Sequence, residues 1–402
     1  MRWTGTGWAW VLWLAVAGAH SGCGDDGSAS GDAGQDGARV DAAGVDAAGV
    51  DARAPDAGTG DAAVDLEGCA SPDLSGLERV DAGPADIGAA IAAAQTRSAG
   101  EARGTVIQLA AGEYGDLLIE DRTFTEGAPL YILGAPGFAS TFTGGGYRGV
   151  YVAGSSYVFM ASLLVRNGWL DGVTVAASDH VVICDFEIHD LRQAGVVIHE
   201  RSTYVDLLYT RIHDTGQENP QWGEGVYVGT GGSGGFPDTT EHVWLEGNVI
   251  TRTANSEGVN VKPETFHVTV RGNDISDTRP GTASQYNQSA LTIEGARGMD
   301  FPRNDEERDV WVEGNRVSMV RLGRWANGIM VGGTGVRVVD NEVMDCEEDG
   351  LYVNGYGDLG MPVFVYGNMI TAVSGSPYRY ASGVDVREES PGANPNRPQA
   401  WW

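Results

Sequence analysis

The sequence predicts an all-β fold in which short strands are wound into a solenoid, and two interleaved repeats carry this prediction. In the first repeat a glycine is followed by a triplet whose first and third residues are apolar and whose middle residue varies. Its copies are residues 171–175, 194–198, 224–228, 257–261, 327–331, 349–353 and 382–386, with 289–293 as a variant that lacks glycine. In the second repeat an apolar strand runs into Gly-Asn or a related turn, at 243–248, 268–273, 310–315, 336–341 and 363–368. The shortest returns are 22 to 25 residues, one turn of a coil whose strands bury their apolar faces only by stacking.

Composition agrees with one elongated body. The chain has 402 residues, 42% of them apolar, and its 60 glycines fit many tight turns and few helices. The net charge of -29 makes nucleic acid and anionic membrane surfaces poor partners for the whole molecule.

Residues 1–22 have the features of an export signal. A positive start at Arg2 precedes an apolar stretch at 8–16 and small residues at 17–19, too short to span a bilayer comfortably. The following His20-Ser21-Gly22-Cys23 resembles a bacterial lipobox, which implies a lipidated Cys23 and an outer-membrane or cell-surface lipoprotein. The alternative is cleavage near Ala19 and a free secreted protein.

Residues 23–66 then supply a tether. From 24 to about 65 the composition reduces to Ala, Gly and Asp without bulky core residues, so the segment cannot offset its ordering entropy and is expected to be disordered. The solenoid domain is assigned to 67–402. Within it, residues 84–95 predict a short helix that opens at Pro84 and caps the exposed end of the coil. The first strands are expected at 105–109, 110–114 and 117–119.

Three cysteines remain in this domain, Cys69, Cys184 and Cys346, and an odd number leaves their pairing open. Cys184 lies in the apolar stretch 181–188 and is interpreted as a packed core thiol.

The rungs resemble those of right-handed parallel β-helix proteins of the pectate-lyase-like superfamily, over about 105–387. The resemblance implies a right-handed parallel β-helix. The superfamily includes lyases, hydrolases, epimerases, adhesins and inactive scaffolds, so the fold alone does not select a function.

Strand alternation indicates which residues face outward. The aliphatics of each triplet point inward, so the residue between them and the residue after them point out. The column after the triplet reads Ala176, His199, Gly229, Lys262, Glu294, Gly332, Asn354 and Arg387. The middle residues of the triplets form the second outward column: Thr174, Val197, Tyr227, Asn260, Thr292, Met330, Tyr352 and Asp385. From these columns we expect a shallow sugar-binding groove with His199, Tyr227, Asn260 and Tyr352 as binding residues.

Lys262 is the single lysine among 26 Lys and Arg residues. Where only positive charge is needed the chain uses arginine, and an amine can lose its proton whereas a guanidinium cannot, which suggests a general base. The alternative is a structural pairing with Glu257, Glu264 or Glu294.

Glu224 and Glu257 occupy the same position on successive rungs. Stacked carboxylates repel unless a cation, a proton or an arginine lies between them, so they are candidate Ca²⁺ ligands. The alternative is a pair that splays into solvent or bonds to loop amides.

Residues 256–262 also resemble the active-site rung of the family that contains chondroitinase B and alginate lyases. In that family a Glu five residues before the catalytic Lys binds calcium, and the next rung supplies an Arg. The resemblance implies that Glu257 binds calcium and Lys262 is the base. Glu294 stands where the Arg is expected, and Arg297 could reach back from the following loop.

Three functions remain open for this exported, monomeric protein. It is a polysaccharide lyase with Lys262 as base, a glycoside hydrolase with Glu294 and Glu257 as its acid pair, or a non-catalytic protein that binds glycans or displays loops. The first reading favours an acidic polysaccharide as partner.

Overall fold

The structure is a computed structural model that describes residues 69, 72–144, 148–168, 170–230, 238–254, 256–263, 265–279, 289–295, 308–321, 326–354, 361–396 and 401–402. The predicted export signal 1–22, the lipidation site Cys23 and the tether 23–66 lie outside the described residues. Within the described part, no helix is long and apolar enough to cross a membrane.

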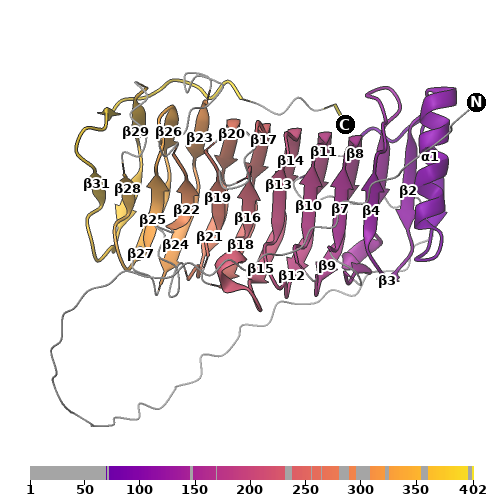
Figure 1. Cartoon of the computed structure of the whole chain (residues 1–402), viewed down its shortest axis with the longest axis horizontal. Helices are drawn as coiled ribbons and strands as arrows, with labels where there is room; N and C mark the ends of the chain where they lie inside the picture. The colour runs from indigo at the N-terminus through magenta and orange to yellow at the C-terminus, as the bar shows by residue number, and fades with distance from the viewer. Residues whose placement is uncertain are drawn as a thin grey trace, which may run out of the picture. The chain divides into compact units, whose positions relative to one another are not determined.

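The described strands form three parallel sheets, as Figure 1 shows. Sheet A has 12 strands: β1 (Glu78–Ala82), β2 (Thr105–Leu109), β5 (Leu130–Leu133), β8 (Ser156–Ala161), β11 (Asp179–Cys184), β14 (Thr203–Leu208), β17 (Glu241–Glu246), β20 (Phe266–Arg271), β23 (Val310–Glu313), β26 (Val336–Val339), β29 (Val363–Tyr366) and β32 (Val386–Arg387). Sheet B has 10 strands: β3 (Gly112–Tyr114), β6 (Ser140–Phe142), β9 (Leu164–Arg166), β12 (Glu187–His189), β15 (Arg211–Thr215), β18 (Val249–Thr253), β21 (Asp274–Ser276), β24 (Arg316–Val320), β27 (Glu342–Cys346) and β30 (Met369–Thr371). Sheet C also has 10: β4 (Leu117–Glu120), β7 (Val150–Ala153), β10 (Val173–Ala176), β13 (Val196–His199), β16 (Val226–Val228), β19 (Val259–Val261), β22 (Ser289–Ile293), β25 (Asn327–Val331), β28 (Leu351–Val353) and β31 (Tyr378–Tyr380). Two short 3₁₀ turns lie at Pro136–Phe138 and Pro220–Trp222.

Each turn of the chain crosses sheets A, B and C in that order and returns to A one rung further on. Val226, Val259 and Leu291 are stacked by the register of sheet C and fully buried, as an inward column requires. The predicted right-handed parallel β-helix is therefore confirmed. Its core is a continuous interior of mostly aliphatic side chains contributed by all three sheets.

The predicted capping helix is present as α1 (Ile87–Glu101), beside β2 at one end of the coil (Figure 1). The helix begins after the predicted start at Pro84, because Pro84 belongs to the turn that precedes it. The helix also extends beyond the predicted end at residue 95. Ile91 and Ala94 bury the face that closes the core. Ala102, in the left-handed conformation with φ 49°, ends the helix.

The last predicted rung is wrong. Residues 382–386 match the repeat, but β31 takes the next place in sheet C, with Arg379 opposite Tyr352, and β32 joins sheet A. The N–H of Leu351 donates to the carbonyl of Pro377, so Pro377 occupies the place where most earlier rungs have glycine. Asp385 and Arg387 therefore do not belong to the predicted outward columns.

Cys184 is not a free core thiol. Val181 and Ile183 point into the coil, whereas Val182 and Cys184 lie on the outer face of sheet A and pack with Phe159 and Trp244. The segment before β1 covers this face, and Cys69 forms a disulfide with Cys184 across 115 residues of sequence. Of the described cysteines, Cys346 keeps a free thiol, and it is buried.

The Gly-Asn turns form a buried asparagine ladder that the repeat pattern did not predict. Asn248, Asn273, Asn315 and Asn341 each donate from Nδ2 to Oδ1 of the next asparagine, at 2.8 to 2.9 Å, and the series ends at Asn368. Each Nδ2 also donates to a strand carbonyl, and the backbone N–H beside it donates to the same Oδ1. Burial of these amides is tolerated because their polar atoms are hydrogen-bonded.

Asn273→Ala is expected to destabilise the protein by about 3 kcal/mol, because the backbone N–H and Nδ2 of buried Asn248 lose their shared acceptor. Urea unfolding followed by circular dichroism would measure the loss. Ser276→Ala, half-buried at the end of the next strand β21, is the control and should stay within about 0.5 kcal/mol of the parent. Equal stabilities for the two variants would contradict a structural role for the ladder.

Candidate active site

The predicted outward residues of sheet C do converge. Tyr227, Asn260 and Thr292 are opposite one another in β16, β19 and β22. Lys262 and Glu294 directly follow β19 and β22, and their N–H groups donate at 2.8 Å to the carbonyls of Val228 and Val261. The parallel ladder therefore continues past the strand ends and stacks these side chains. We refer to Tyr227, Asn260, Lys262 and Glu294 as the Lys262 cluster.

Lys262 is the centre of this cluster. Its Nζ lies 2.6 Å from Oε1 of Glu294 and 4.7 Å from the centroid of the Tyr227 ring. The Lys262 side chain is 12% exposed and that of Glu294 is 32% exposed. Asn260 and Thr292 are almost fully buried. Tyr227, Lys262 and Glu294 are partly accessible, whereas Asn260 and Thr292 are enclosed although they point away from the core, so the shallow groove stays a prediction.

The charge on Lys262 bears on its chemistry. Burial alone would lower the pKa of its amine, but the neighbouring Glu294, Tyr227 and Glu257 outweigh burial and raise that pKa above its ordinary value. A buried ammonium is stabilised by a carboxylate at this distance. In the free protein Lys262 is therefore protonated, and a role as base would require it to lose that proton when substrate binds.

Asn260 connects two carboxylates. Its Nδ2 donates to Oε1 of Glu257 at 3.1 Å and to Oε1 of Glu294 at 3.3 Å. Its Oδ1 is buried and accepts no hydrogen bond from any described residue. A buried carbonyl oxygen without a donor is costly and indicates a place for a ligand or a cation.

Glu224 and Glu257 lie on adjacent rungs, where the N–H of Gly225 donates to the carbonyl of Glu257. They are 5% and 2% exposed, so they do not splay into solvent. Burial raises the pKa of Glu224 to about 7, and burial with the charge of Glu224 raises that of Glu257 to about 8. Glu257 accepts from Oγ of Ser256 at 3.0 Å. Near neutral pH this pair therefore retains at least part of a proton unless a cation replaces it.

These oxygens fit calcium in kind. Two carboxylates and the amide Oδ1 of Asn260 are the hard donors that Ca²⁺ prefers, although calcium takes six to eight oxygens and needs further ligands from water or substrate.

His199 and Tyr352 lie on the same face but do not contact Lys262. His199 ends β13, two rungs or about 10 Å away, with Gly229 between. Burial lowers the pKa of His199, so it is neutral at neutral pH. Tyr352 lies three rungs or about 14 Å from Asn260, beneath the guanidinium of Arg379, which is 4.5 Å from its ring. These two residues therefore lie outside the Lys262 cluster.

Arg297, the arginine expected to reach back from the loop after Glu294, lies outside the described residues. The structure instead reveals Arg308, just before β23 and outside the predicted rungs. Arg308 is 1% exposed, and its Nη2 donates to the carbonyl oxygen of Glu294 and, at 3.5 Å, to that of Lys262. A Cβ at Gly333 would lie 1.9 Å from Nη1, so a side chain there would displace the Arg308 guanidinium. Arg308 fixes the two strand ends that present the ion pair.

No family model and no curated protein matches this chain. Among solved structures it is similar to the alginate lyase from Paenibacillus sp. str. FPU-7, with 17% identity and a TM-score of 0.54 over 77% of this chain and 99% of that one. It also matches the Azotobacter vinelandii mannuronan C-5 epimerase AlgE6 A-module, with 16% identity and a TM-score of 0.45 over 79% of this chain and 99% of that one. A third match is the pectate lyase Pel9A, with 13% identity and a TM-score of 0.42 over 74% of this chain and 73% of that one. The first of these likenesses supports the fold: the chain shares its parallel β-helix with that alginate lyase.

Proposed function

We propose that this protein is an enzyme that cleaves an acidic polysaccharide by β-elimination at the Lys262 cluster. The observation that carries the proposal is the enclosed Lys262–Glu294 ion pair beside Tyr227, on the outer face of sheet C. The chain's single lysine is placed where a uronate carboxylate could compete with Glu294 for its ammonium. The alginate lyase of the same fold is named for action on such a polymer, which supports the choice of substrate class.

The proposed chemistry removes the proton α to the uronate carboxylate and then breaks the bond to the 4-oxygen of the sugar. The electron pair of the C–H bond forms the new double bond, and the departing oxygen takes a proton. Because Lys262 is protonated in the free protein, we assign it to stabilise the developing enolate and to protonate the departing oxygen. Glu294 is the proposed proton acceptor, with Tyr227 as the other candidate within the cluster. The assignment of Lys262 as the base stays a prediction, and the pH dependence of activity distinguishes it from a role as proton donor.

Calcium remains part of the proposal. Glu224, Glu257 and Oδ1 of Asn260 would hold the ion beneath the cluster, where it would supply positive charge toward a substrate carboxylate.

The glycoside hydrolase alternative is not favoured by this arrangement. Glu257 is 2% exposed and is hydrogen-bonded to Ser256 and Asn260, so it cannot reach a sugar alongside Glu294. A two-carboxylate mechanism requires both acids to flank the scissile bond.

A substrate screen tests the proposed activity. Polymers of mannuronate, guluronate, galacturonate and glucuronate are incubated with the full protein, with and without calcium, and ultraviolet absorbance is followed. We expect at least one polymer to yield the conjugated double bond of an unsaturated uronate. New reducing ends without that absorbance would indicate hydrolysis instead. Binding of a uronan with neither signal would place the protein with non-catalytic glycan-binding or display proteins.

We further propose that the protein is exported, monomeric and held at a membrane only by lipid on Cys23. Mass spectrometry of the mature N-terminal peptide from the native host should show a diacylglyceryl-modified Cys23. An unmodified N-terminus at His20 would favour free secretion and leave the β-helix assignments untouched.

A further inference from the structure

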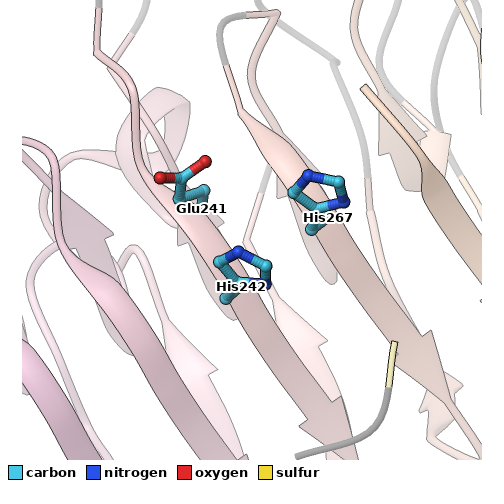
Figure 2. Close-up of side chains that lie close together, drawn as sticks. All are labelled: Glu241, His242 and His267. Carbon is cyan, nitrogen blue, oxygen red and sulfur yellow. The ribbon is translucent and has the colours of Figure 1, made fainter. Parts of the chain in front are cut away.

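A second chemical cluster lies on sheet A, outside the Lys262 cluster. Figure 2 shows Glu241 and His242 on one strand, β17, and His267 on its neighbour, β20. One ligand atom from each of these three side chains lies within 4.8 Å of the other two, and all three residues are half-buried. Among the described residues, this is the one group of three His, Cys, Asp or Glu side chains that meets such a criterion.

The backbone explains why two imidazoles meet here. Sheet A carries a column of left-handed residues at the same place on successive rungs, and His242 and His267 have φ of 54° and 52°. Their rings stack at 4.7 Å with an angle of 12° between the planes. The column is a general feature of the fold, because its other members also stack: Tyr157, His180 and Tyr204.

The same column supplies a fourth group. Asp309, with φ 42°, occupies the next rung, and its Oδ2 lies 3.7 Å from Nδ1 of His267. Asp309 is itself fixed by Arg337 at 2.5 Å, by Nε1 of Trp311 at 3.0 Å and by Nδ2 of Asn396 at 2.7 Å. A carboxylate against one ring nitrogen of a histidine orients the ring and leaves its other nitrogen for a metal.

Ring packing alone does not account for this composition. Tyr157 and Tyr204 fill the same column without imidazole, so stacking requires only an aromatic ring. His180 has an acid at the preceding position, Asp179 at 2.5 Å, but tyrosines on both sides, so it lacks a second imidazole. His242 and His267 combine two adjacent imidazoles with a carboxylate on each side.

We propose that Glu241, His242 and His267 form a binding site for a divalent transition metal of the zinc class, with Asp309 as the group that positions His267. Two imidazole nitrogens and one carboxylate oxygen suit Zn²⁺ and its neighbours, whereas calcium prefers oxygen ligands alone. Ligand atoms around tetrahedral zinc lie about 3.3 Å apart for bonds of about 2.0 to 2.1 Å, so atoms that now lie within 4.8 Å of one another must approach by up to about 1.5 Å, and the two stacked rings must turn so that a nitrogen of each faces the ion. The fourth position stays open to water or an added ligand.

The site braces the corner where the chain passes from sheet C to sheet A. The N–H of His267 donates at 2.7 Å to the carbonyl of Arg308, whose guanidinium contacts the carbonyls of Lys262 and Glu294. A metal would therefore join two adjacent rungs behind the strand ends that present the Lys262 cluster. The proposal does not depend on the proposed lyase activity.

Metal binding to the full protein, stripped with chelator, tests the site. Isothermal titration with ZnCl₂ should show one ion per chain, and Zn²⁺ should raise the melting temperature by several degrees. Co²⁺ substitution should give visible absorption bands typical of nitrogen and oxygen ligation, and excess Ca²⁺ should not displace the ion.

Phenylalanine variants separate binding from folding, because Phe keeps a stacked ring and removes the ligand. His242→Phe and His267→Phe should each weaken Zn²⁺ binding at least 10-fold and lose the zinc-dependent rise in melting temperature. His180→Phe, in the same column, is the matched control and should bind zinc as the parent does. Absence of zinc binding by the parent would overturn the proposal. Binding that survives in both ligand variants would do so too, and would point instead to His189 and His213, which stack on sheet B.

Discussion

Lys262→Arg is expected to lower turnover on the responsive uronan by at least ~10² while circular dichroism stays unchanged. Arginine keeps the positive charge beside Glu294 but cannot transfer a proton at accessible pH. The lost chemistry is therefore proton transfer, whichever direction it takes. The control is Arg166→Lys, an exchange between the same two residue types beside exposed Glu113 on sheet B, away from the Lys262 cluster, which should retain activity within a few-fold. Full activity in Lys262→Arg would remove Lys262 from the mechanism.

The pH dependence of kcat/KM distinguishes donor from base. Glu294, Tyr227 and Glu257 raise the pKa of Lys262, so the amine remains charged through the alkaline range in which most proteins are assayed. If the ammonium is the active form, activity should be level to about pH 9 and fall only as the raised pKa is approached. If the neutral amine is the base, activity should instead climb over the same range.

Glu294→Gln supplies an independent check, because it removes the largest contribution that raises the pKa of Lys262. If Lys262 is the proton donor, the remaining activity should fall at a lower alkaline pH than the activity of the parent does. Tyr227→Phe should then show whether the phenol is the proton acceptor. A loss larger than that of Glu294→Gln would assign the proton to Tyr227.

The arrangement of the rungs was predictable because strand alternation and a parallel register are local rules. Counting from the triplets placed Asn260 and Tyr227 on one face and stacked Lys262 on the Glu294 rung, as the structure shows. The rule failed at 382–386, where a matching pattern lies in a different sheet because β31 had already filled the place.

Strand alternation predicts the direction of a side chain but not how much of it is exposed to solvent. A side chain that points away from the core was expected to be exposed, yet Asn260 is 2% exposed and the Lys262 side chain is 12% exposed. Arg308 and Cys69 were missed for a related reason. Both reach the rungs from irregular segments, whose path depends on tertiary packing and not on a repeat.

Glu257→Gln is expected to change how stability depends on pH. The folded protein raises the pKa of Glu257 to about 8 and of Glu224 to about 7, whereas an unfolded glutamate titrates near 4.5. The folded state therefore binds more protons than the unfolded state between about pH 4.5 and 8, and this contribution to stability is present at low pH and lost as pH rises through that window. One pKa unit corresponds to about 1.4 kcal/mol, so raising the pKa of Glu257 from 4.5 to about 8 costs up to roughly 5 kcal/mol at pH 8.5.

Thermal unfolding at pH 5 and pH 8.5 measures this effect. The parent should melt lower at pH 8.5, while Glu257→Gln, which keeps the size of the side chain and an oxygen for Nδ2 of Asn260, should lose much less. Buried Asp206, with a pKa raised to about 8, adds to the slope of both proteins, so the difference between them isolates Glu257. Glu113→Gln, an exposed partner of Arg166, is the control and should follow the parent.

Calcium turns the same experiment into a test of the cation site. An ion held by Glu224, Glu257 and Asn260 competes with protons, so it should restore the melting temperature of the parent at pH 8.5 and have little effect at pH 5. Glu257→Gln should respond weakly at both, because one of the two carboxylates is gone. If calcium leaves the parent unchanged at pH 8.5 while the pH slope still depends on Glu257, the pair is relieved by protons alone. The positive charge that faces a uronate in the proposed mechanism then comes from Lys262, and the proposed lyase activity should not need added metal.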